Sequence, residues 1–299
     1  MQDRPLAAAG SILLAMVIIG FIDQFVSVIA ETSSVWTFHF LRSLMMLALA
    51  GGWLTLRGDW PVVRAWRGVA ARAAFVATAM IIYFGSLGFL PVAQAAAGLF
   101  TAPIWILIFS VAVFGLRIGP ARIAAIFLGF AGVMAVLSPD LSDLTLGTFV
   151  PVVAGACYAM AAIATREWCA GEATVTLAMA VFAMLGLYGL VGIGIVAVIG
   201  AGDDFVTRGW VTPDAATLGI LLLQAVCSLV SVLLLTRGYQ LTEASKASVF
   251  EYSVLATSAF FGWLVWGDVL TPTGYLGLVA IAVAGAIIAY RGRTREVAA

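Results

Sequence analysis

Ten long apolar stretches, each almost free of charged residues, follow one another along this chain with short polar gaps between them. A helix that crosses the hydrocarbon core of a bilayer, roughly 30 Å thick, needs about 20 consecutive apolar residues. Because each stretch is close to this length, the pattern predicts an all-α membrane protein with ten transmembrane helices. They are expected at residues 7–30, 35–56, 70–90, 93–114, 120–137, 147–166, 174–199, 216–236, 244–266 and 273–290.

The composition supports this interpretation and narrows the function. Apolar residues make up 63% of the 299 residues, charged residues make up 10%, and the mean hydropathy is +1.11. A soluble domain is far more polar. The formal net charge is zero, so no basic surface indicates nucleic acid as a partner. The gaps are too short for a soluble catalytic domain, and Cys157, Cys169 and Cys227, which lack C-x-x-C spacing, are expected to pack as small residues.

The basic residues predict the orientation of the helices. Lys and Arg are retained on the cytoplasmic side during insertion, and here they fall almost entirely in alternate gaps. These gaps and the termini carry Arg4, Arg57, Arg64, Arg67, Arg72, Arg117, Arg122, Arg166, Arg237, Lys246, Arg291, Arg293 and Arg295, whereas the other gaps carry Glu31, Asp140, Asp143, Asp203, Asp204, Asp214 and Asp268. The exceptions are Arg208, in an outer loop, and Arg42, inside the second helix. Ten helices then place both termini in the cytoplasm, and we expect the inner (plasma) membrane of a bacterium.

The two halves of the chain share one layout, five helices in residues 1–140 and five in residues 145–299. Their final helices follow the motifs VFGLRIGP and VWGDVLTP, so that Pro120 recurs 152 positions later as Pro272. Because five is an odd number, the second half enters the bilayer from the other side. Inverted repeats of this kind place a shared cavity near the midplane, between halves that rock against each other. The alternative is a gene duplication that only built a stable bundle.

The repeated motifs also carry a resemblance to a known family. The fourth and ninth helices open on the small-residue stretches AQAAAG and ASKAS, and a GxxxxP turn follows each helix. In this layout of five plus five helices with short loops, the chain resembles the EamA family of the drug/metabolite transporter superfamily. The resemblance implies export of amino acids or other small metabolites, and it is greatest to the aromatic amino-acid exporter type. Many members carry an acidic residue in both turns, whereas here only Asp268 is present and the first turn has Leu116 and Arg117.

Three ionisable residues lie at a similar depth near the outer ends of the first two predicted helices. Asp23 is in the first, and His39 and Arg42 share one face of the second. A charge at mid-bilayer costs roughly 2.5–3.5 kcal/mol on insertion scales, so each needs a local explanation. Either Asp23 and Arg42 form an ion pair that locks the helices together, or Arg42 extends to the outer headgroups, or the group holds a substrate carboxylate at the outer mouth. His39 is the sole histidine, so a His-based metal site is excluded and no metal is expected.

Glu251 is predicted near the midplane, in the ninth helix. No basic residue lies three or four positions away, and Lys246, five positions away, is on a different face. A carboxyl group in this low-dielectric environment is expected to be neutral for much of the time. It either binds a substrate amino group, or carries a proton during transport, or is a protonated structural residue that hydrogen-bonds across helices.

Aromatic and small polar residues near the middles of the helices complete a predicted substrate cavity. Pro103 interrupts the fourth helix, and interrupted helices are common where transporters bind their substrates. A buried Trp or Tyr needs a partner for its polar atom, which either a wet cavity or a neighbouring carbonyl provides. The expected lining residues are Thr78, Tyr83, Phe100, Thr101, Trp105, Tyr158, Gln224, Ser228, Ser248 and Tyr252, together with Glu251.

No enzyme chemistry is evident in the sequence. We find no nucleophile–base pair, no Walker motif and no metal-ligand spacing, so no cofactor is expected. The prediction is a secondary transporter that exports amino acids, chiefly neutral and aromatic ones, or similar small metabolites by alternating access. Its partners are then the small-molecule substrate, the lipid bilayer and, as a coupling ion, protons. The alternatives are an exporter of cationic drugs, an intramembrane enzyme built on the Asp23–His39–Arg42 group, and a membrane scaffold.

Overall fold

The computed structural model describes residues 4–139, 142 and 145–296, and all regular secondary structure in this part of the chain is helical. Ten segments of it are long and apolar enough to cross a membrane, which confirms the predicted fold class. Asp140, Asp143 and residues 297–299, which the sequence predictions include, lie outside the described residues. The elements are α1 (Pro5–Ile22), η1 (Asp23–Phe25), α2 (Val26–Thr32), α3 (Val35–Arg57), α4 (Trp66–Ser86), α5 (Val92–Leu99), α6 (Ala102–Ala112), α7 (Pro120–Leu137), η2 (Leu146–Phe149), α8 (Val150–Glu167), α9 (Thr174–Ile199), α10 (Ala215–Leu241), α11 (Ala244–Glu251), α12 (Val254–Trp266) and α13 (Pro272–Glu296).

Most helix boundaries lie within a few residues of their predicted positions. The largest difference is in the tenth helix, which was predicted to end at residue 290 but continues as α13 to Glu296 through a basic segment. Polar residues also explain the next two differences. The third helix, predicted at residues 70–90, is α4, which starts four residues earlier because Arg67 and Arg72 interrupt the apolar pattern of its first turns. The eighth helix, predicted to end at residue 236, continues as α10 to Leu241 through a mostly polar final segment. In both cases the helix extends beyond the apolar stretch that revealed it.

Three spans are interrupted near their middles. Span 1 consists of α1 and α2 joined by the 3₁₀ turn η1, span 4 of α5 and α6, and span 9 of α11 and α12. The break in span 4 agrees with the prediction from Pro103, which lies in the first turn of α6 and has no N–H to donate to the previous turn. No proline accompanies the breaks in spans 1 and 9, and the sequence did not predict them.

The breaks in spans 4 and 9 are built from the same hydrogen bond. The Thr101 hydroxyl donates to the Gly98 carbonyl at 2.6 Å, and the Ser253 hydroxyl donates to the Phe250 carbonyl at 2.7 Å. Ser253 and Phe250 come 152 positions after Thr101 and Gly98. Hydroxyl groups of this kind compete with the helix N–H groups for backbone carbonyls. The two halves therefore interrupt equivalent helices with equivalent residues.

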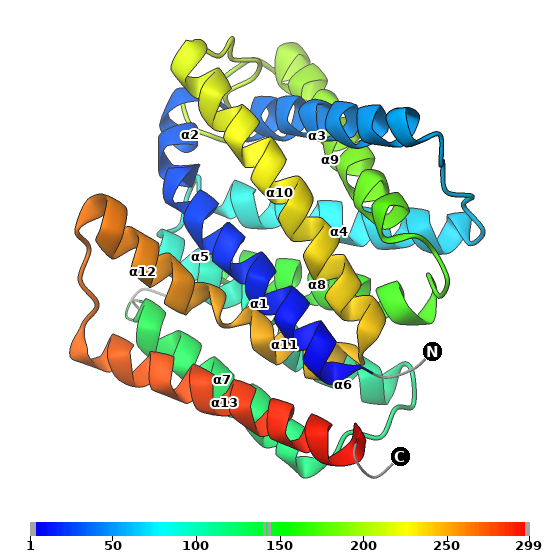
Figure 1. Ribbon diagram of the computed structural model, residues 1–299. Helices are drawn as coiled ribbons and strands as arrows, with labels where there is room; N and C mark the ends of the chain where they lie inside the picture. Colours follow the sequence, from blue (N-terminus) through cyan, green and yellow to red (C-terminus); the bar gives the residue numbers. More distant parts are fainter. Residues whose placement is uncertain (1–3, 140–141, 143–144, 297–299) are drawn as a thin grey trace.

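Helix boundaries and packing repeat between the halves. α11, α12 and α13 begin 152 positions after α5, α6 and α7. The turns before α7 and α13 contain Gly115 and Gly267, whose φ angles of 63° and 76° favour glycine. α1 packs along α10, α8 packs along α4, and α7 packs along α13 (Figure 1). In the repeat, α1 corresponds to α8, α4 to α10 and α7 to α13. Exchanging the halves therefore converts the α1–α10 pair into the α8–α4 pair and leaves the α7–α13 pair unchanged, as an inverted repeat requires.

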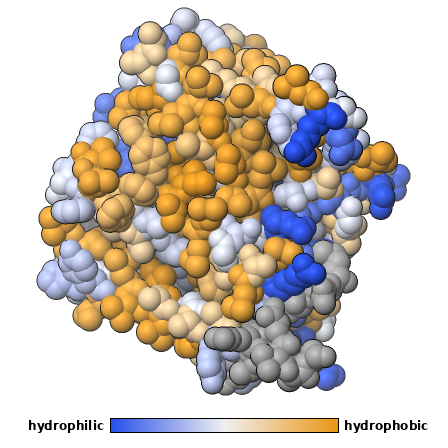
Figure 2. All heavy atoms as spheres, viewed as in Figure 1, coloured by the Kyte–Doolittle hydropathy of each residue, from blue (hydrophilic) through white to orange (hydrophobic). Residues whose placement is uncertain are grey.

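The two sides of the helix bundle are distinguished by the chain ends. We call the terminal face the side on which α1 begins and α13 ends, and the far face the opposite side (Figure 1). The N–H of Arg4 donates to the Leu241 carbonyl at 2.9 Å, so α10 ends on the terminal face. Between the faces, exposed apolar side chains such as Leu14 and Leu222 cover the helices. Figure 2 shows this hydrophobic surface over α1 and α10, and a surface of this kind is typical of contact with lipid.

Candidate functional site

Glu251 is the last residue of α11, and its carboxylate accepts hydrogen bonds from two tyrosines. The Tyr158 hydroxyl of α8 donates to Oε2 at 2.9 Å, and the Tyr239 hydroxyl of α10 donates to Oε1. Glu251 is half-buried, and none of the described cations forms an ion pair with it. The consecutive helices α10 and α11, together with the distant α8, thus bring one carboxyl group and two hydroxyl groups together at the break in span 9. Such a group can accept a cationic substrate group or a proton.

Tyr239 was not among the residues predicted for the site. The hydrophobic pattern ended the eighth helix at residue 236, which left Tyr239 in a loop. It comes 11 positions after Ser228, which is three helical turns, so the two residues share one face of α10. Extending the predicted helix through its polar end would therefore have placed Tyr239 beside the other candidates.

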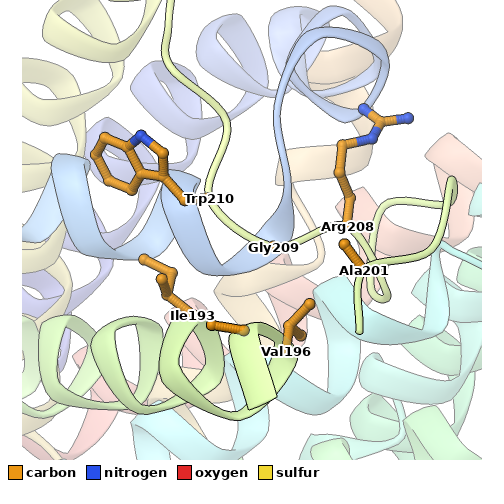
Figure 3. Close-up of a pocket in the computed structure, with 7 residues that line it drawn as sticks. Ile193, Val196, Ala201, Arg208, Gly209 and Trp210 are labelled. Atoms are coloured by element: carbon orange, nitrogen blue, oxygen red, sulfur yellow. The ribbon is translucent and has the colours of Figure 1, made fainter. Parts of the chain in front are cut away.

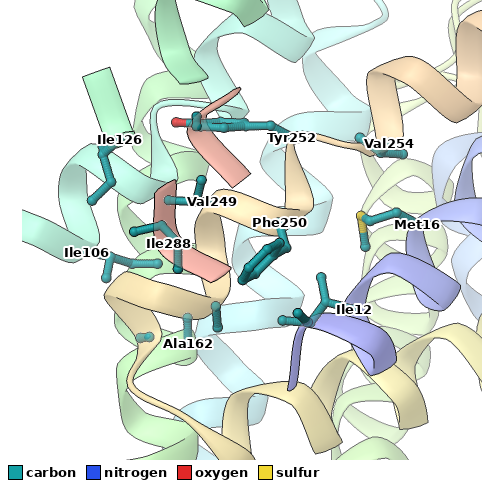
Figure 4. Close-up of a cluster of buried hydrophobic side chains, with 14 of the residues drawn as sticks. Ile12, Met16, Ile106, Ile126, Ala162, Val249, Phe250, Tyr252, Val254 and Ile288 are labelled. Atoms are coloured by element: carbon teal, nitrogen blue, oxygen red, sulfur yellow. The ribbon is translucent and has the colours of Figure 1, made fainter. Parts of the chain in front are cut away.

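The breaks in spans 4 and 9 contact each other through predicted site residues. Tyr252, which is fully buried, donates its hydroxyl to the Phe100 carbonyl at 3.4 Å, and the two rings meet edge to face with centroids 6.1 Å apart. Phe100 and Tyr252 are equivalent residues of the two halves. Gly129 leaves room for this contact, because a methyl group there would lie 2.6 Å from the Tyr252 ring. Figure 4 shows Tyr252 at the break, one turn beyond Val249 and Phe250 of α11.

The other predicted lining residues lie apart from this contact or are held by other bonds. Gln224 donates to the Ile22 carbonyl at 2.7 Å and so satisfies a backbone group at the start of η1. The Thr78 and Tyr188 hydroxyls are 3.4 Å apart. Trp105, in α6, stacks on Phe109 of the same helix, with ring centroids 5.5 Å apart. These contacts are structural in the present conformation.

The two predicted serines are buried, and the predicted tyrosine of α4 is half-buried. Ser228 faces inward from α10, and Ser248 lies inside α11 with a hydroxyl that has no hydrogen-bond partner among the described residues. Tyr83 packs edge to face on Phe84 and interacts electrostatically with Asp23. Tyr83 is therefore associated with the Asp23 group rather than with Glu251.

The structure places Asp23, His39 and Arg42 near one another but without a direct ion pair. Asp23 begins η1 and is exposed, whereas Arg42 is 7% exposed and its guanidinium carbon lies 4.3 Å from the centroid of the Phe38 ring. Arg42 Nη2 lies 3.2 Å from His39 Nδ1. The charges of Asp23 and Arg42 attract each other, but no oxygen of Asp23 is within 4 Å of an Arg42 nitrogen. The guanidinium is thus enclosed by protein rather than extended to the headgroups.

A charged cluster joins the two halves at the terminal face. Arg122, in the first turn of α7, forms an ion pair with Glu243 and donates to the Ser245 hydroxyl at 3.1 Å. Lys246 Nζ lies 3.5 Å from the second oxygen of Glu243. A cleft beside the cluster has a volume of only about 10 Å³. We call Arg122, Glu243, Ser245 and Lys246 the terminal cluster.

One buried cation was missed because it was counted among the basic residues of the cytoplasmic gaps, although it lies at the start of the predicted third helix. Arg72 lies in the second turn of α4 and is 6% exposed. Its guanidinium donates to the Thr165 hydroxyl at 2.6 Å, to the Leu177 carbonyl at 3.2 Å and to the Thr236 hydroxyl at 3.2 Å. It therefore connects α4 to α8, α9 and α10 at the terminal face. The sequence signal for this role is an arginine followed directly by an apolar helix.

The larger of the two best-defined pockets lies at a helix end, not between the halves. It has a volume of about 300 Å³ and lies where the end of α9 meets the loop at residues 201–210. Figure 3 shows Ile193, Val196 and Trp210 around it, with the Arg208 side chain directed away. The predicted cavity at the helix breaks is not one of these two pockets. Among the described residues, no three His, Cys, Asp or Glu side chains are grouped to hold a metal ion.

Comparison with known proteins agrees with this architecture. The model of the EamA-like transporter family matches residues 6–138 and 145–290. The chain is 27% identical over 249 residues to a riboflavin transporter of Rhizobium johnstonii, covering 83% of this chain and 76% of that protein. It is 25% identical to a riboflavin transporter of Vibrio cholerae, over 66% of this chain and 62% of the other. It is also 27% identical to the pseudopaline exporter CntI of Pseudomonas aeruginosa, over 71% of each chain.

A solved structure, described only as a crystal structure of protein, has the same fold. It superposes with a TM-score of 0.77 at 14% sequence identity, over 98% of this chain and 100% of the other. The relatives are named as transporters of compounds other than aromatic amino acids, so the comparisons support the family and not the predicted exporter type. Two matched halves, ten spans and transporter-named relatives identify a multi-pass membrane transporter. This chain belongs to the EamA-like transporter family of the drug/metabolite transporter superfamily.

Proposed function

We propose that this chain is a secondary transporter of the bacterial inner membrane that exports amino acids, chiefly neutral and aromatic ones, or similar small metabolites by alternating access. In this proposal the halves 1–140 and 145–299 rock against each other around the helix breaks in spans 4 and 9. Interrupted helices at a repeat interface are typical of transporter binding sites. The alternation of basic gaps along the sequence supports cytoplasmic termini, which makes the terminal face cytoplasmic.

The observation that carries the proposal is Glu251 at the break in span 9. Its carboxyl group has two hydroxyl donors, Tyr158 and Tyr239, and no cationic partner among the described residues. A substrate ammonium group would supply the missing positive charge, and a proton would supply it when the substrate is absent. The half-buried ring of Phe100, at the facing break, offers a surface for an apolar side chain. An amino acid with a neutral or aromatic side chain fits both features.

A flavin is a second candidate substrate. Two of the relatives named above are riboflavin transporters. The helix breaks of this chain carry the Phe100–Tyr252 ring contact, and the stacked pair of Trp105 and Phe109 follows on α6. A planar heteroaromatic ring would stack on such side chains. Riboflavin carries no ammonium group, so its transport would not depend on the charge of Glu251.

The test is transport by the purified chain in proteoliposomes, with a panel of amino acids, riboflavin and an organic cation at two pH values. We expect wild-type protein to transport neutral and aromatic amino acids and E251Q to lose most of this activity and its pH dependence. E31Q removes an exposed far-face carboxyl group and is the matched control, which should behave as wild type. Unchanged transport and pH dependence in E251Q would end the proposed role of Glu251. Transport of riboflavin alone would favour the second candidate.

A further inference from the structure

Four neighbouring residues of α3 form a buried group that lies between α4 and α9. His39, Ser43 and Phe38 are fully buried, and Arg42 is 7% exposed. The guanidinium of Arg42 lies over the Phe38 ring and 5.9 Å from the centroid of the Phe84 ring. The His39 ring also packs edge to face on Phe84, with centroids 5.1 Å apart. Aromatic rings therefore fix the positions of both the guanidinium and the imidazole.

The hydrogen bonds of this group leave donors without acceptors. Arg42 can only donate, so at its 3.2 Å contact with His39 the Nδ1 atom must be the acceptor. The proton of the neutral imidazole is then on Nε2, which is buried and has no partner among the described residues. Arg42 Nε and the Ser43 hydroxyl are buried and unpartnered in the same way. Buried donors without acceptors are costly, and this group has three of them on consecutive turns of one helix.

The carboxyl group of Asp23 interacts with the charge of Arg42 but forms no ion pair with it and is not bound to these donors. Asp23 lies in η1, which packs against α12 and the adjoining parts of span 1 rather than along α3. Its side chain lies at the surface of the helix bundle, within span 1. The guanidinium charge is therefore balanced from a distance by a carboxylate on an interrupted helix.

We propose that Arg42 and His39 form a receptor for the carboxylate of the transported substrate, and that Asp23 is the counter-ion that this carboxylate replaces. Arg42 Nε and His39 Nε2 donate to the substrate carboxylate, and Ser43 supplies a third hydrogen bond. Planar guanidinium groups bind carboxylates with two parallel hydrogen bonds, which adds geometric selectivity to charge. The inference rests on the proposed transport function and assigns the second charged group of its amino-acid substrate.

Replacement of Asp23 links binding to the helix break in span 1. When a substrate carboxylate neutralises Arg42, the attraction that draws Asp23 toward α3 is removed. Asp23 then has no charge partner in α3, and η1, which carries it, is free to change its position against α12. Only ligands with an acidic group would release it. The contact between the substrate carboxylate and Arg42 therefore both selects the ligand and releases η1 for a conformational change.

The experiment compares L-phenylalanine with L-phenylalaninamide, which keeps the ring and the amino group but lacks the carboxylate. Binding of each compound is measured on the purified full chain in detergent by its effect on the melting temperature over a concentration series. We expect wild-type protein to bind the acid roughly 10–100-fold more tightly than the amide, the range expected for hydrogen bonds to a charged group. R42Q should reduce this ratio to about twofold or less, and H39N, which keeps an acceptor for Arg42 but loses the Nε2 donor, should fall between them.

Asp23 supplies the decisive contrast. D23N removes the competing carboxylate, so it should preserve or increase the preference for the acid, opposite in sign to R42Q. If the residues served only to hold helices together, D23N and R42Q would lower the melting temperature and weaken both ligands alike. Equal binding of acid and amide by wild-type protein, or parallel effects of D23N and R42Q, would overturn the inference. E31Q is the matched control and should keep the wild-type ratio.

Counterflow of the same two compounds in proteoliposomes separates this inference from the proposed function. Carboxylate-selective binding without transport would leave the receptor standing and defeat the transport proposal. Transport of both compounds at equal rates, with equal affinities, would leave the transporter standing and defeat the receptor.

Discussion

The half-helices α5 and α11 are equivalent in the two halves of the chain, yet their surroundings differ. Residues 244–250 of α11 are all buried, and Glu243, directly before them, belongs to the terminal cluster. α5 begins on the far face with Pro91 and Val92, which are both exposed. The same backbone element is thus enclosed at one face of the membrane and partly open at the other.

Helix packing and side chains both contribute to this difference. α11 packs against α6 and α7, whereas the equivalent contacts of α5 with α12 and α13 are much weaker. The positions equivalent to Glu243 and Arg122 are occupied by Pro91 and Gly274, so the far face has no counterpart of their ion pair. The position equivalent to Glu251 is Leu99. The fold of the two halves is therefore repeated while its charges are not. A repeated fold that carries this ion pair between its halves at the terminal face, with no equivalent at positions 91 and 274, is expected to favour closure at the terminal face.

Breaking the terminal cluster should have the largest effect on this asymmetry. E243A removes the ion pair of Arg122 with Glu243, whose side chains are 15% and 35% exposed. After allowance for this exposure, we expect closure at the terminal face to lose about 1–2 kcal/mol of free energy. The terminal face should then open more often, and alkylation of S248C, in a background without native cysteines, should become about 5–30-fold faster.

Ala96, the far-face equivalent of Ser248, supplies the control. In an alternating-access protein, opening of one face closes the other, so A96C should be alkylated more slowly in the E243A background. Faster alkylation of both S248C and A96C would indicate local unfolding. It would contradict an exchange between one conformation closed at the terminal face and another closed at the far face.

Removal of the hydroxyl at each helix break should have a smaller and unequal effect. S253A removes the hydrogen bond to Phe250 in a span without proline, so α11 and α12 are expected to join more readily into one helix. T101A removes the equivalent bond, but Pro103 still prevents a continuous span 4. We expect S253A to change stability by about 0.5–1.5 kcal/mol and T101A by less. Melting temperatures of the two purified variants measure the contrast, and a larger shift in T101A would contradict it.

The fold was largely predictable because its signals are local. α7 matched its predicted range of 120–137 because a Gly-Pro turn precedes it and a Ser-Pro turn follows it. α10 was underestimated because its last turn is polar, although it is buried against α1. The break in span 4 was visible as Pro103. The break in span 9 was hidden because it depends on a serine hydroxyl, which in most helices has no such effect.

The candidate site was predictable residue by residue but not as an arrangement. Glu251 and Tyr158 were chosen because each is costly to bury, and the structure joins them by a hydrogen bond across 93 positions of sequence. Gln224 donates a hydrogen bond to the Ile22 carbonyl, which is available because span 1 is interrupted at η1. The sequence did not predict this interruption. Contacts between distant helices are set by packing, and the hydrophobic pattern of one helix carries no information about its neighbours.

An ion pair transplanted to the far face should reduce the asymmetry slightly. P91E combined with G274R places a carboxylate and a guanidinium at the positions equivalent to Glu243 and Arg122. Pro91 is exposed, whereas Gly274 is buried in the first turn of α13 directly after exposed residues, so we expect a gain of only about 0.2–1 kcal/mol for far-face closure. Alkylation of A96C should slow by up to about fivefold. Each single variant is a control and should have no such effect, and an equal slowing in P91E alone would show that the ion pair is not its cause.

The smallest expected effect concerns the far-face loop at residues 200–214, which polar contacts of its own side chains stabilise. The backbone N–H of Thr207, with help from that of Val206, holds the pKa of Asp204 below its usual range. Because this pKa is lower in the folded loop than in a disordered one, the carboxylate stabilises the loop at neutral pH. That contribution is lost as the pH falls through the lowered pKa. Hydrogen exchange of the loop amides should therefore be slower in wild type than in D204N at neutral pH and equal in the two proteins in acid. A difference that persists in acid would show that the amide side chain disturbs the loop for another reason and that far-face closure does not depend on this charge.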